Sequence, residues 1–150
     1  MAQSLSRILL HLVFSTHRRE PRISPAIQPL LYEYLGGILE QQQCRPIAIG
    51  GMPDHVHIFY LATRSRSVAD VVRQVKVGST MWLRQQGPEF SDFSWQAGYG
   101  VFSVSESQSE TVEEYVRNQA AHHLKINFQT ELRFLLEKHQ VEYDERYLWE

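Results

Sequence analysis

The sequence predicts an α+β domain in which strands and helices follow the order β-α-β-β-α-β. Apolar residues form short, nearly continuous runs typical of strands, and elsewhere they recur at the three-to-four-residue spacing of helices. The chain has 150 residues, of which 43% are hydrophobic and 21% charged, the profile of one globular domain. This element order is the ferredoxin-like arrangement, with a four-stranded antiparallel sheet and two helices on one face.

Local signals place the first six elements. They are, in order, a strand at 5–15, a loop at 16–25, a helix at 25–43, strands at 45–49 and 55–61, and a helix at 67–86. Ser24 can cap the first helix, with Pro25 at its first helical position. Ser67 can cap the second, with Asp70 at the capping-box position. Between the two strands, the segment 50–54 contains the Gly, Pro and Asp residues of a turn.

Three more elements complete the expected domain. They are a fourth strand at 99–104, a third helix that a cap at Ser107 or Ser109 starts and that ends near Lys125, and a fourth helix at 130–139. We expect a single domain over 1–150, in which a helix near 109–125 precedes a helical C-terminal tail at 126–150. The end of this tail, 140–150, is acidic and aromatic.

Cysteine content and hydropathy exclude several classes of protein. A single cysteine, Cys44, rules out an internal disulfide and a cysteine-based zinc cluster. The early apolar run at 8–14 is too short to span a bilayer and is interrupted by His11. It also lacks the cleavage pattern of a signal peptide. We therefore expect a cytoplasmic protein with no membrane partner.

Charge is distributed unevenly along the chain, although the net charge is only −2. Residues 1–87 carry 10 Lys and Arg against 5 Asp and Glu, whereas residues 88–150 carry 5 against 12. The basic part can present a face that binds phosphates, since arginine matches phosphate geometry. Alternatively, the two parts attract each other or the charges are simply solvated. The candidate phosphate contacts are Arg18, Arg19, Arg22, Arg73 and Lys76.

Two histidines lie two residues apart in the third predicted strand. Side chains at this spacing point to the same side of a sheet, so His55 and His57 project together while Val56 enters the opposite, core-facing layer. Two adjacent imidazoles provide half of a metal site. The position at a sheet end allows a site open to solvent. The alternative is a pair of histidines that only satisfy hydrogen bonds.

A tyrosine and a glutamine lie four residues apart in the third predicted helix. This spacing places Tyr115 and Gln119 on one face, where a phenol can act as nucleophile and an amide oxygen can bind a cation. His122 and His123 flank that face and can add a ligand, although histidines near a helix end more often interact with the helix dipole. Two other tyrosines compete as nucleophile: Tyr99, between two glycines, and Tyr60, which faces away from His57.

Four separate segments contain the most distinctive motifs. They are His-Leu-Val-Phe-Ser-Thr at 11–16, Gly-Gly-Met-Pro-Asp-His-Val-His at 50–57, Trp-Gln-Ala-Gly-Tyr-Gly-Val-Phe-Ser-Val-Ser at 95–105, and Tyr-Val-Arg-Asn-Gln-Ala-Ala-His-His at 115–123. Together and in this order they resemble the single-tyrosine HUH transposases of bacterial insertion sequences. The resemblance extends over about 8–149. HUH denotes His-hydrophobic-His, which here is His55-Val56-His57.

The resemblance implies a site and an activity. Tyr115 matches the nucleophilic tyrosine, and Gln119 matches the third metal ligand beside His55 and His57. Members act as homodimers on single-stranded DNA with hairpins at element ends, using Mg²⁺ or Mn²⁺, and the tyrosine helix often completes the partner's site. Attack by the phenolate would leave a 5′-phosphotyrosine and a free 3′-hydroxyl. That covalent bond retains the energy needed to rejoin strands without ATP.

Three alternatives share parts of this pattern. The first is a binding module on the same fold that stacks bases and needs neither metal nor Tyr115. The second is an HUH relative that processes repeated chromosomal hairpins in a domesticated setting. The third is a small metal-dependent hydrolase in which His55 and His57 activate water. Its hydrolytic activity would persist after replacement of Tyr115 by phenylalanine.

Overall fold

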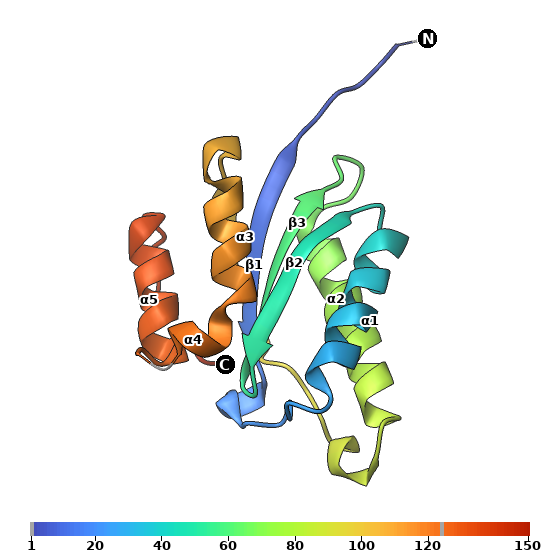
Figure 1. The fold of residues 1–150 in the computed structure, drawn as a ribbon, viewed down its shortest axis with the longest axis vertical. Coiled ribbons are helices and arrows are strands. Elements are labelled where there is room, and N and C mark those ends of the chain that lie inside the picture. The colour runs from blue at the N-terminus through green and yellow to red at the C-terminus, as the bar shows by residue number, and fades with distance from the viewer. Residues whose placement is uncertain (1, 124) are drawn as a thin grey trace.

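A computed structural model describes residues 2–123 and 125–150. Its sheet has four strands in the order β2-β3-β1-β4, all antiparallel to their neighbours. Figure 1 labels the first three of these, β2, β3 and β1. The elements are β1 (Ile8–Ser15), η1 (His17–Arg19), α1 (Gln28–Gln41), β2 (Arg45–Met52), β3 (His55–Ala62), α2 (Val68–Arg84), η2 (Pro88–Phe90), β4 (Gly100–Val104), η3 (Glu106–Gln108), α3 (Ser109–Arg117), α4 (Gln119–His122) and α5 (Phe128–Lys138). The predicted α+β, ferredoxin-like fold is confirmed.

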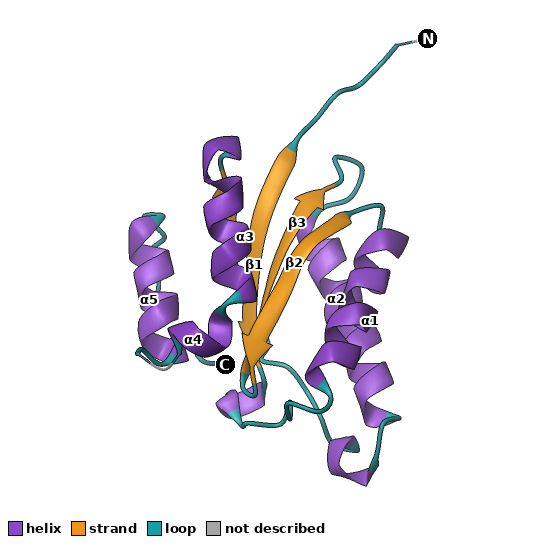
Figure 2. Cartoon of the chain, in the orientation of Figure 1, coloured by secondary structure: helices purple, strands orange, loops and turns teal. Residues whose placement is uncertain are grey.

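Helices cover both faces of the sheet. The helices α1 and α2 pack on one face, and α3 and α5 lie on the other, with α4 between them (Figures 1 and 2). The larger core lies under α1 and α2 and includes Leu12, Val56 and Ile58. On the opposite face, Val13 and Phe102 pack with α5, and Phe59 packs with α3. The C-terminal helices therefore build a second layer over the sheet.

The two central strands place histidines in the interior of that second layer. Strand β1 pairs with β3 so that Val13 lies opposite His57 and His11 lies opposite Phe59. The first strand begins at Ile8 rather than at residue 5, because its last pairing with β3 is Ile8 with Ala62 and no partner strand continues beyond it among the described residues. Pairing with β3 on one side and with β4 on the other makes β1 a central strand.

The start of the first helix differs from the expectation. Helix α1 begins at Gln28, three residues after Pro25, and the side chain of Ser24 makes no capping hydrogen bond. Instead the Ser24 carbonyl accepts hydrogen bonds from the amides of Ile27, at 3.1 Å, and Gln28, at 3.2 Å, which forms a turn ahead of the helix. The second cap is as predicted, since Ser67 Oγ accepts from the Asp70 amide at 3.0 Å.

The third helix is interrupted where a continuous helix over 109–125 was expected. At Asn118 the backbone leaves the helical region, with φ −101° and ψ 30°, so α3 ends and α4 begins. The predicted caps Ser107 and Ser109 make no such bond, because the turn η3 runs directly into α3. Leu124, also within the predicted helix, lies outside the described residues. Asn118 is therefore a break between α3 and α4, three residues after Tyr115, and we call it the joint at Asn118.

The C-terminal tail is only partly helical. Helix α5 begins at Phe128, two residues before the predicted start, because Asn127 caps it by accepting from the Thr130 amide at 2.9 Å. After α5 the chain forms turns, and Leu148 and Trp149 pack against the cluster that contains Phe102. None of the helices within 2–123 and 125–150 is long and apolar enough to cross a membrane.

A pair of glycines expected in a turn belongs to strand β2 instead. The strand continues to Met52 and leaves only Pro53 and Asp54 to connect it to β3. A Cβ atom at Gly50 would lie 2.0 Å from the carbonyl oxygen of Val116 in α3. The absence of a side chain therefore allows the end of α3 to approach the sheet closely, next to the joint at Asn118.

Replacement of Gly50 by alanine is expected to lower the free energy of unfolding by about 3 kcal/mol, the upper part of the range for overpacking. The obstacle is backbone rather than a flexible side chain, so it has no easy way to move. Urea unfolding of both proteins measures the difference. Gly37→Ala in α1 is the matched control, since its Cβ meets nothing within 4 Å and the change removes a helix-weakening glycine. Equal stability of the Gly50→Ala protein and the wild type would contradict the packing argument.

Candidate metal centre and nucleophile

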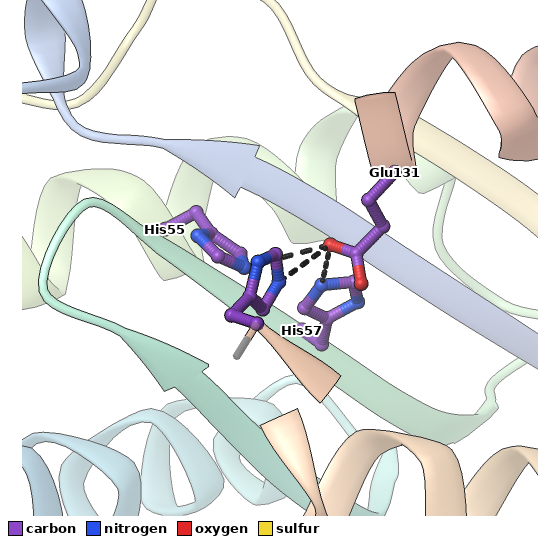
Figure 3. Close-up of side chains that lie close together, drawn as sticks. His55, His57 and Glu131 are labelled. Atoms are coloured by element: carbon purple, nitrogen blue, oxygen red, sulfur yellow. Dashed lines mark hydrogen bonds and ion pairs between the residues drawn. The ribbon is translucent and has the colours of Figure 1, made fainter. Parts of the chain in front are cut away.

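The two histidines of β3 project to the same side of the sheet, as their spacing predicts. His55 and His57 point toward the layer formed by α3, α4 and α5, whereas Val56 belongs to the core under α1 and α2 (Figure 3). Both imidazoles are fully buried, which differs from the solvent-open site expected at a sheet end. Burial lowers the pKa of His57 to about 4, although a nearby carboxylate acts in the opposite direction.

The outer nitrogen of each imidazole has a partner that holds the ring in place. His55 Nδ1 lies 2.7 Å from Oδ1 of Asp54, and His57 Nδ1 lies 2.7 Å from Nε2 of His11. His11 is itself buried in β1, and burial together with His57 keeps its pKa well below the usual range. Such partners fix ring orientation in metal sites and leave the other nitrogen, Nε2, to face the ligand.

The carboxylate of Glu131 in α5 contacts both histidines. Oε1 of Glu131 lies 2.8 Å from Nε2 of His57, 3.5 Å from Nε2 of His55 and 3.2 Å from Nε2 of His123 (Figure 3 labels the first two). Glu131 is 1% exposed. Burial favours its neutral form, yet hydrogen bonds from His123 and His57 hold the pKa of Glu131 well below its usual range. One donor atom from each of these four residues lies within 4.8 Å of the others, so they can hold a metal ion.

Tyr115 lies directly beside this cluster. Its hydroxyl donates a short hydrogen bond to Oε2 of Glu131 and is 3.3 Å from Nε2 of His122. Its ring packs edge-on against His57, with centroids 5.8 Å apart. Burial, and then the negative charge of Glu131, raise the pKa of the Tyr115 phenol above its usual range. The structure thus brings the predicted nucleophile to the predicted histidines.

Gln119 also reaches the cluster, across the joint at Asn118. Its Oε1 lies 3.0 Å from Nε2 of His123 and 3.4 Å from Nε2 of His55. Its Nε2 donates to the backbone carbonyl of Tyr115 at 3.1 Å, which points the amide oxygen at the imidazoles. The buried side chain is therefore oriented for binding a cation, as its spacing from Tyr115 suggested.

A cavity opens onto the tyrosine. It has a volume of about 620 Å³ and lies between α3 and α5 over β4. Tyr115 and Glu131 line it together with apolar side chains that include Phe102, Phe134 and Leu135. The size is in the range of pockets that bind small molecules or parts of larger ones. The cavity therefore borders the side chain of Tyr115.

The predicted phosphate contacts lie elsewhere and several have protein partners. Arg22 pairs with Asp92 at 2.7 Å, and Arg73 pairs with Asp70 at 3.2 Å on the exposed surface of α2. Lys76 donates to three backbone carbonyls, those of residues 96, 97 and 98, at 2.6–3.2 Å. Arg18 is exposed, and the Arg19 guanidinium lies 5.6 Å from the ring centre of Trp149. Roles of these five residues in binding DNA stay predictions.

The competing tyrosines do not reach the cluster. Tyr60 belongs to the core under α1 and α2, and Tyr99 precedes β4 and is 40% exposed. Glu131 and the buried His11, by contrast, were not among the predicted site residues. Each interrupts an apolar pattern: His11 within the first strand and Glu131 between Phe128 and Leu135 on the buried stripe of α5. A polar group in a buried stripe is the signal that could have identified both.

Comparisons with known proteins agree on one family and one fold. The sequence pattern of the family described as "Transposase IS200 like" matches residues 4–119. A relative, the ISDra2 transposase TnpA of Deinococcus radiodurans, is 25% identical over 114 residues, which cover 73% of this chain and 81% of the relative.

Two solved structures share the fold. A crystal structure described as that of a transposase from Deinococcus radiodurans R1 superposes with a TM-score of 0.62 at 24% identity, covering 79% of this chain and 98% of that one. A REP-associated tyrosine transposase bound to a REP hairpin superposes with a TM-score of 0.60 at 11% identity, covering 82% of this chain and 74% of that one.

Proposed function

Since this chain belongs to the family of IS200-like transposases, we propose that it cleaves and rejoins single-stranded DNA at the ends of an insertion sequence through a 5′-phosphotyrosine on Tyr115. Family membership supports a DNA-cleaving enzyme. The observation that carries the finer proposal is the position of the Tyr115 hydroxyl, which is hydrogen-bonded to Glu131 inside the histidine cluster. A nucleophile and a cation site are thus adjacent on one chain.

The donor set fits a divalent cation. We assign the cation to His55 and His57, with the amide oxygen of Gln119 as the third ligand that the resemblance implies, and Mg²⁺ or Mn²⁺ as the ion. The fit rests on the Gln119 oxygen, 3.4 Å from Nε2 of His55, and on the inner Nε2 atoms of His55 and His57, which both face Oε1 of Glu131. The outer nitrogens are held by other groups. When bound, the cation would polarise the scissile phosphate and offset the charge that develops on it.

The chain's own residues supply the nucleophile and its orientation. The oxygen of Tyr115 loses its proton and forms a bond to phosphorus while the bond between phosphorus and the 3′ oxygen breaks. The leaving 3′ oxygen takes up a proton, so the other strand departs with a 3′-hydroxyl and no net proton is gained or lost. Glu131 Oε2 accepts the hydrogen bond from the phenol and thereby aims its oxygen. Attack by a second 3′-hydroxyl on the phosphotyrosine then rejoins DNA and frees Tyr115. The cavity beside the tyrosine gives the unpaired strand a path to it.

The partner we propose is single-stranded DNA that carries hairpins. Support comes from the family and from a structural neighbour that is bound to a REP hairpin. A homodimer fits this substrate, because each chain offers one Tyr115 and two element ends need two nucleophiles. Processing of repeated chromosomal hairpins is the second candidate function, favoured by the same neighbour. It uses the same chemistry and differs only in the DNA that is bound.

Tyr115 lies against the histidines of its own chain, so it is expected to act in cis. A mixture of two inactive variants, Tyr115→Phe and His57→Gln, should then form no more covalent protein–DNA product than either alone. In such a mixture the one intact tyrosine and the one intact histidine pair lie on different chains. Labelled DNA on a denaturing gel measures the product. Recovery of product in the mixture would mean that the tyrosine helix reaches the partner's site.

A strand-joining assay tests the proposed function. The wild-type protein is incubated with labelled single-stranded element ends and Mn²⁺ or Mg²⁺, and an unlabelled strand with a free 3′-hydroxyl is then added. We expect a covalent protein–DNA product first and a joined strand second. Cleavage without a covalent product would favour the hydrolase, and binding without cleavage would favour the binding module. Faster reaction with chromosomal hairpins than with element ends would favour the domesticated enzyme.

A further inference from the structure

Hydrogen-bond acceptors gather at the centre of the histidine cluster. The Asp54 carboxylate and the Ile126 carbonyl can only accept, so Nδ1 of His55 and Nδ1 of His123 each carry the hydrogen. With a cation bound, Nε2 of both rings would present a lone pair to it. The oxygens of Glu131 and Gln119 point at these same atoms. A cation placed among these converging nitrogen and oxygen atoms would interact favourably with all of them.

The carboxylate oxygen of Glu131 lies close to the inner nitrogens of all three histidines. From Oε1 of Glu131, the Nε2 atoms of His57, His123 and His55 lie at 2.8, 3.2 and 3.5 Å. Ligands about 2.1 Å from a common ion lie about 3.0–3.4 Å apart in octahedral or tetrahedral geometry. The Glu131 oxygen is therefore within a few tenths of an ångström of the spacing that a ligand would have from each of the three nitrogens.

The surroundings of these residues are those of a preorganised site. His55, His57 and Glu131 are each 1% exposed or less. Every imidazole of the set has its outer nitrogen bonded, to Asp54, to His11 or to the Ile126 carbonyl. Outer bonds of this kind orient metal-ligating histidines and strengthen them as ligands.

We propose that Glu131 and His123 are metal ligands in this chain and that they add to His55, His57 and Gln119 in a site for a transition-metal dication such as Mn²⁺. The proposal deepens the function proposed above and rests on it for the use of the ion in strand transfer. Both added ligands lie beyond residues 4–119, the segment that matches the family. Helix α5 then contributes a ligand to the active centre in addition to packing against the sheet.

The chemistry of the donor set determines which ion it selects. Mg²⁺ prefers oxygen ligands and keeps several waters, whereas imidazole suits Mn²⁺, Fe²⁺, Co²⁺ and Zn²⁺. Three imidazoles and one carboxylate therefore disfavour Mg²⁺. The carboxylate also brings a negative charge that a site of two imidazoles and one amide lacks, so it raises affinity for any dication. We expect Mn²⁺ to bind at least about 100-fold more tightly than Mg²⁺.

Binding of Mn²⁺ to the DNA-free protein tests the proposal, with free Mn²⁺ followed by electron paramagnetic resonance. Glu131→Gln keeps the shape of the side chain and removes its charge, and it should weaken Mn²⁺ binding about 100-fold or more. Loss of an outer partner costs about 10–100-fold, so His11→Phe should weaken binding by about tenfold. Glu137→Gln is the matched control: it is the same substitution on the exposed side of α5 and should change nothing. Circular dichroism confirms that each variant is folded.

A measurement on the wild-type protein tests the proposal without variants that could fail to fold. X-ray absorption of the Mn²⁺-loaded protein counts imidazole ligands, and three support the proposal, whereas two overturn the role of His123. Equal Mn²⁺ affinity of Glu131→Gln and wild type overturns the role of Glu131. Equal affinity combined with faster cleavage would show that Glu131 occupies the place of the DNA phosphate instead, which also overturns it.

Failure of the proposed function would look different. Suppose that the wild type binds Mn²⁺ through Glu131 but forms no covalent product with any single-stranded DNA. The metal site would then be supported and the strand-transfer activity refuted. Suppose instead that the wild type forms the product and that Glu131→Gln binds Mn²⁺ as tightly as the wild type. The strand-transfer activity would then be supported and the role of Glu131 as a ligand refuted.

Discussion

Replacement of Tyr115 by phenylalanine is expected to abolish the covalent protein–DNA product while DNA binding persists. The substitution removes one oxygen atom, the one that would bond to phosphorus. It leaves the ring between His57 and His122 in place. It also frees Glu131 from one hydrogen bond, but the carboxylate keeps its contacts to His57 and His123. The loss should therefore come from chemistry and not from a collapsed site.

The measurement is the yield of protein-linked labelled DNA on a denaturing gel. Nucleophile removal typically leaves only the catalysis that binding and electrostatics provide, so we expect a loss of at least about 10⁴-fold. Tyr99→Phe is the matched control, because Tyr99 is an exposed tyrosine with no place in the cluster. It should leave the yield unchanged. A normal yield from Tyr115→Phe would move the nucleophile to another residue.

Replacement of His57 by glutamine is expected to reduce formation of the covalent product by about 10³-fold or more. Preorganised charge at a reacting centre contributes on the order of 10²–10³ for a single group, and loss of a ligand also weakens occupancy by the ion. His57 lies between Glu131 and His11, so the change disturbs both the inner and the outer contacts. Chelation of metal from the wild type should have the same effect, and Mn²⁺ should restore activity.

The control for this substitution is His139→Gln. His139 lies on the same face of the sheet and packs against Phe102, with ring centroids 4.6 Å apart, yet it has no place among the four clustered donor residues. His139 also lines the cavity beside Tyr115, so its replacement measures any loss that comes from the cavity alone. We expect that loss to be at most about tenfold, because the cluster stays intact. Activity of the His57→Gln protein that chelators do not affect would argue that the cluster is structural.

The order of the elements and the side to which the histidines project were both predictable from the sequence. A strand alternates its side chains with a period of two, so Val56 in one core places His55 and His57 on the other face without any tertiary information. The cap at Ser67 was similarly local, since its acceptor and donor lie three residues apart. Such features depend on residues close together in the sequence, so the local sequence is enough to predict them.

The joint at Asn118 and the role of Glu131 depend on packing between distant segments. Local helical signals run through Asn118, and the close approach of the α3 carbonyl at Val116 to Gly50 is visible only in the folded chain. Glu131 meets His57 across 74 residues of sequence, through the docking of α5 on the sheet. That docking also buries the histidines, which explains why a strand end expected to be open is covered.

Mapping of the DNA-linked peptide by mass spectrometry tests the central claim most directly. The wild-type protein is incubated with single-stranded element ends and Mn²⁺, the DNA is digested to a single nucleotide, and the protein is cleaved into peptides. The account predicts a nucleotide attached to Tyr115 through its 5′ phosphate, and none on this peptide when metal is withheld. A nucleotide on Tyr99 or another residue, or cleaved DNA with every peptide unmodified, would contradict it.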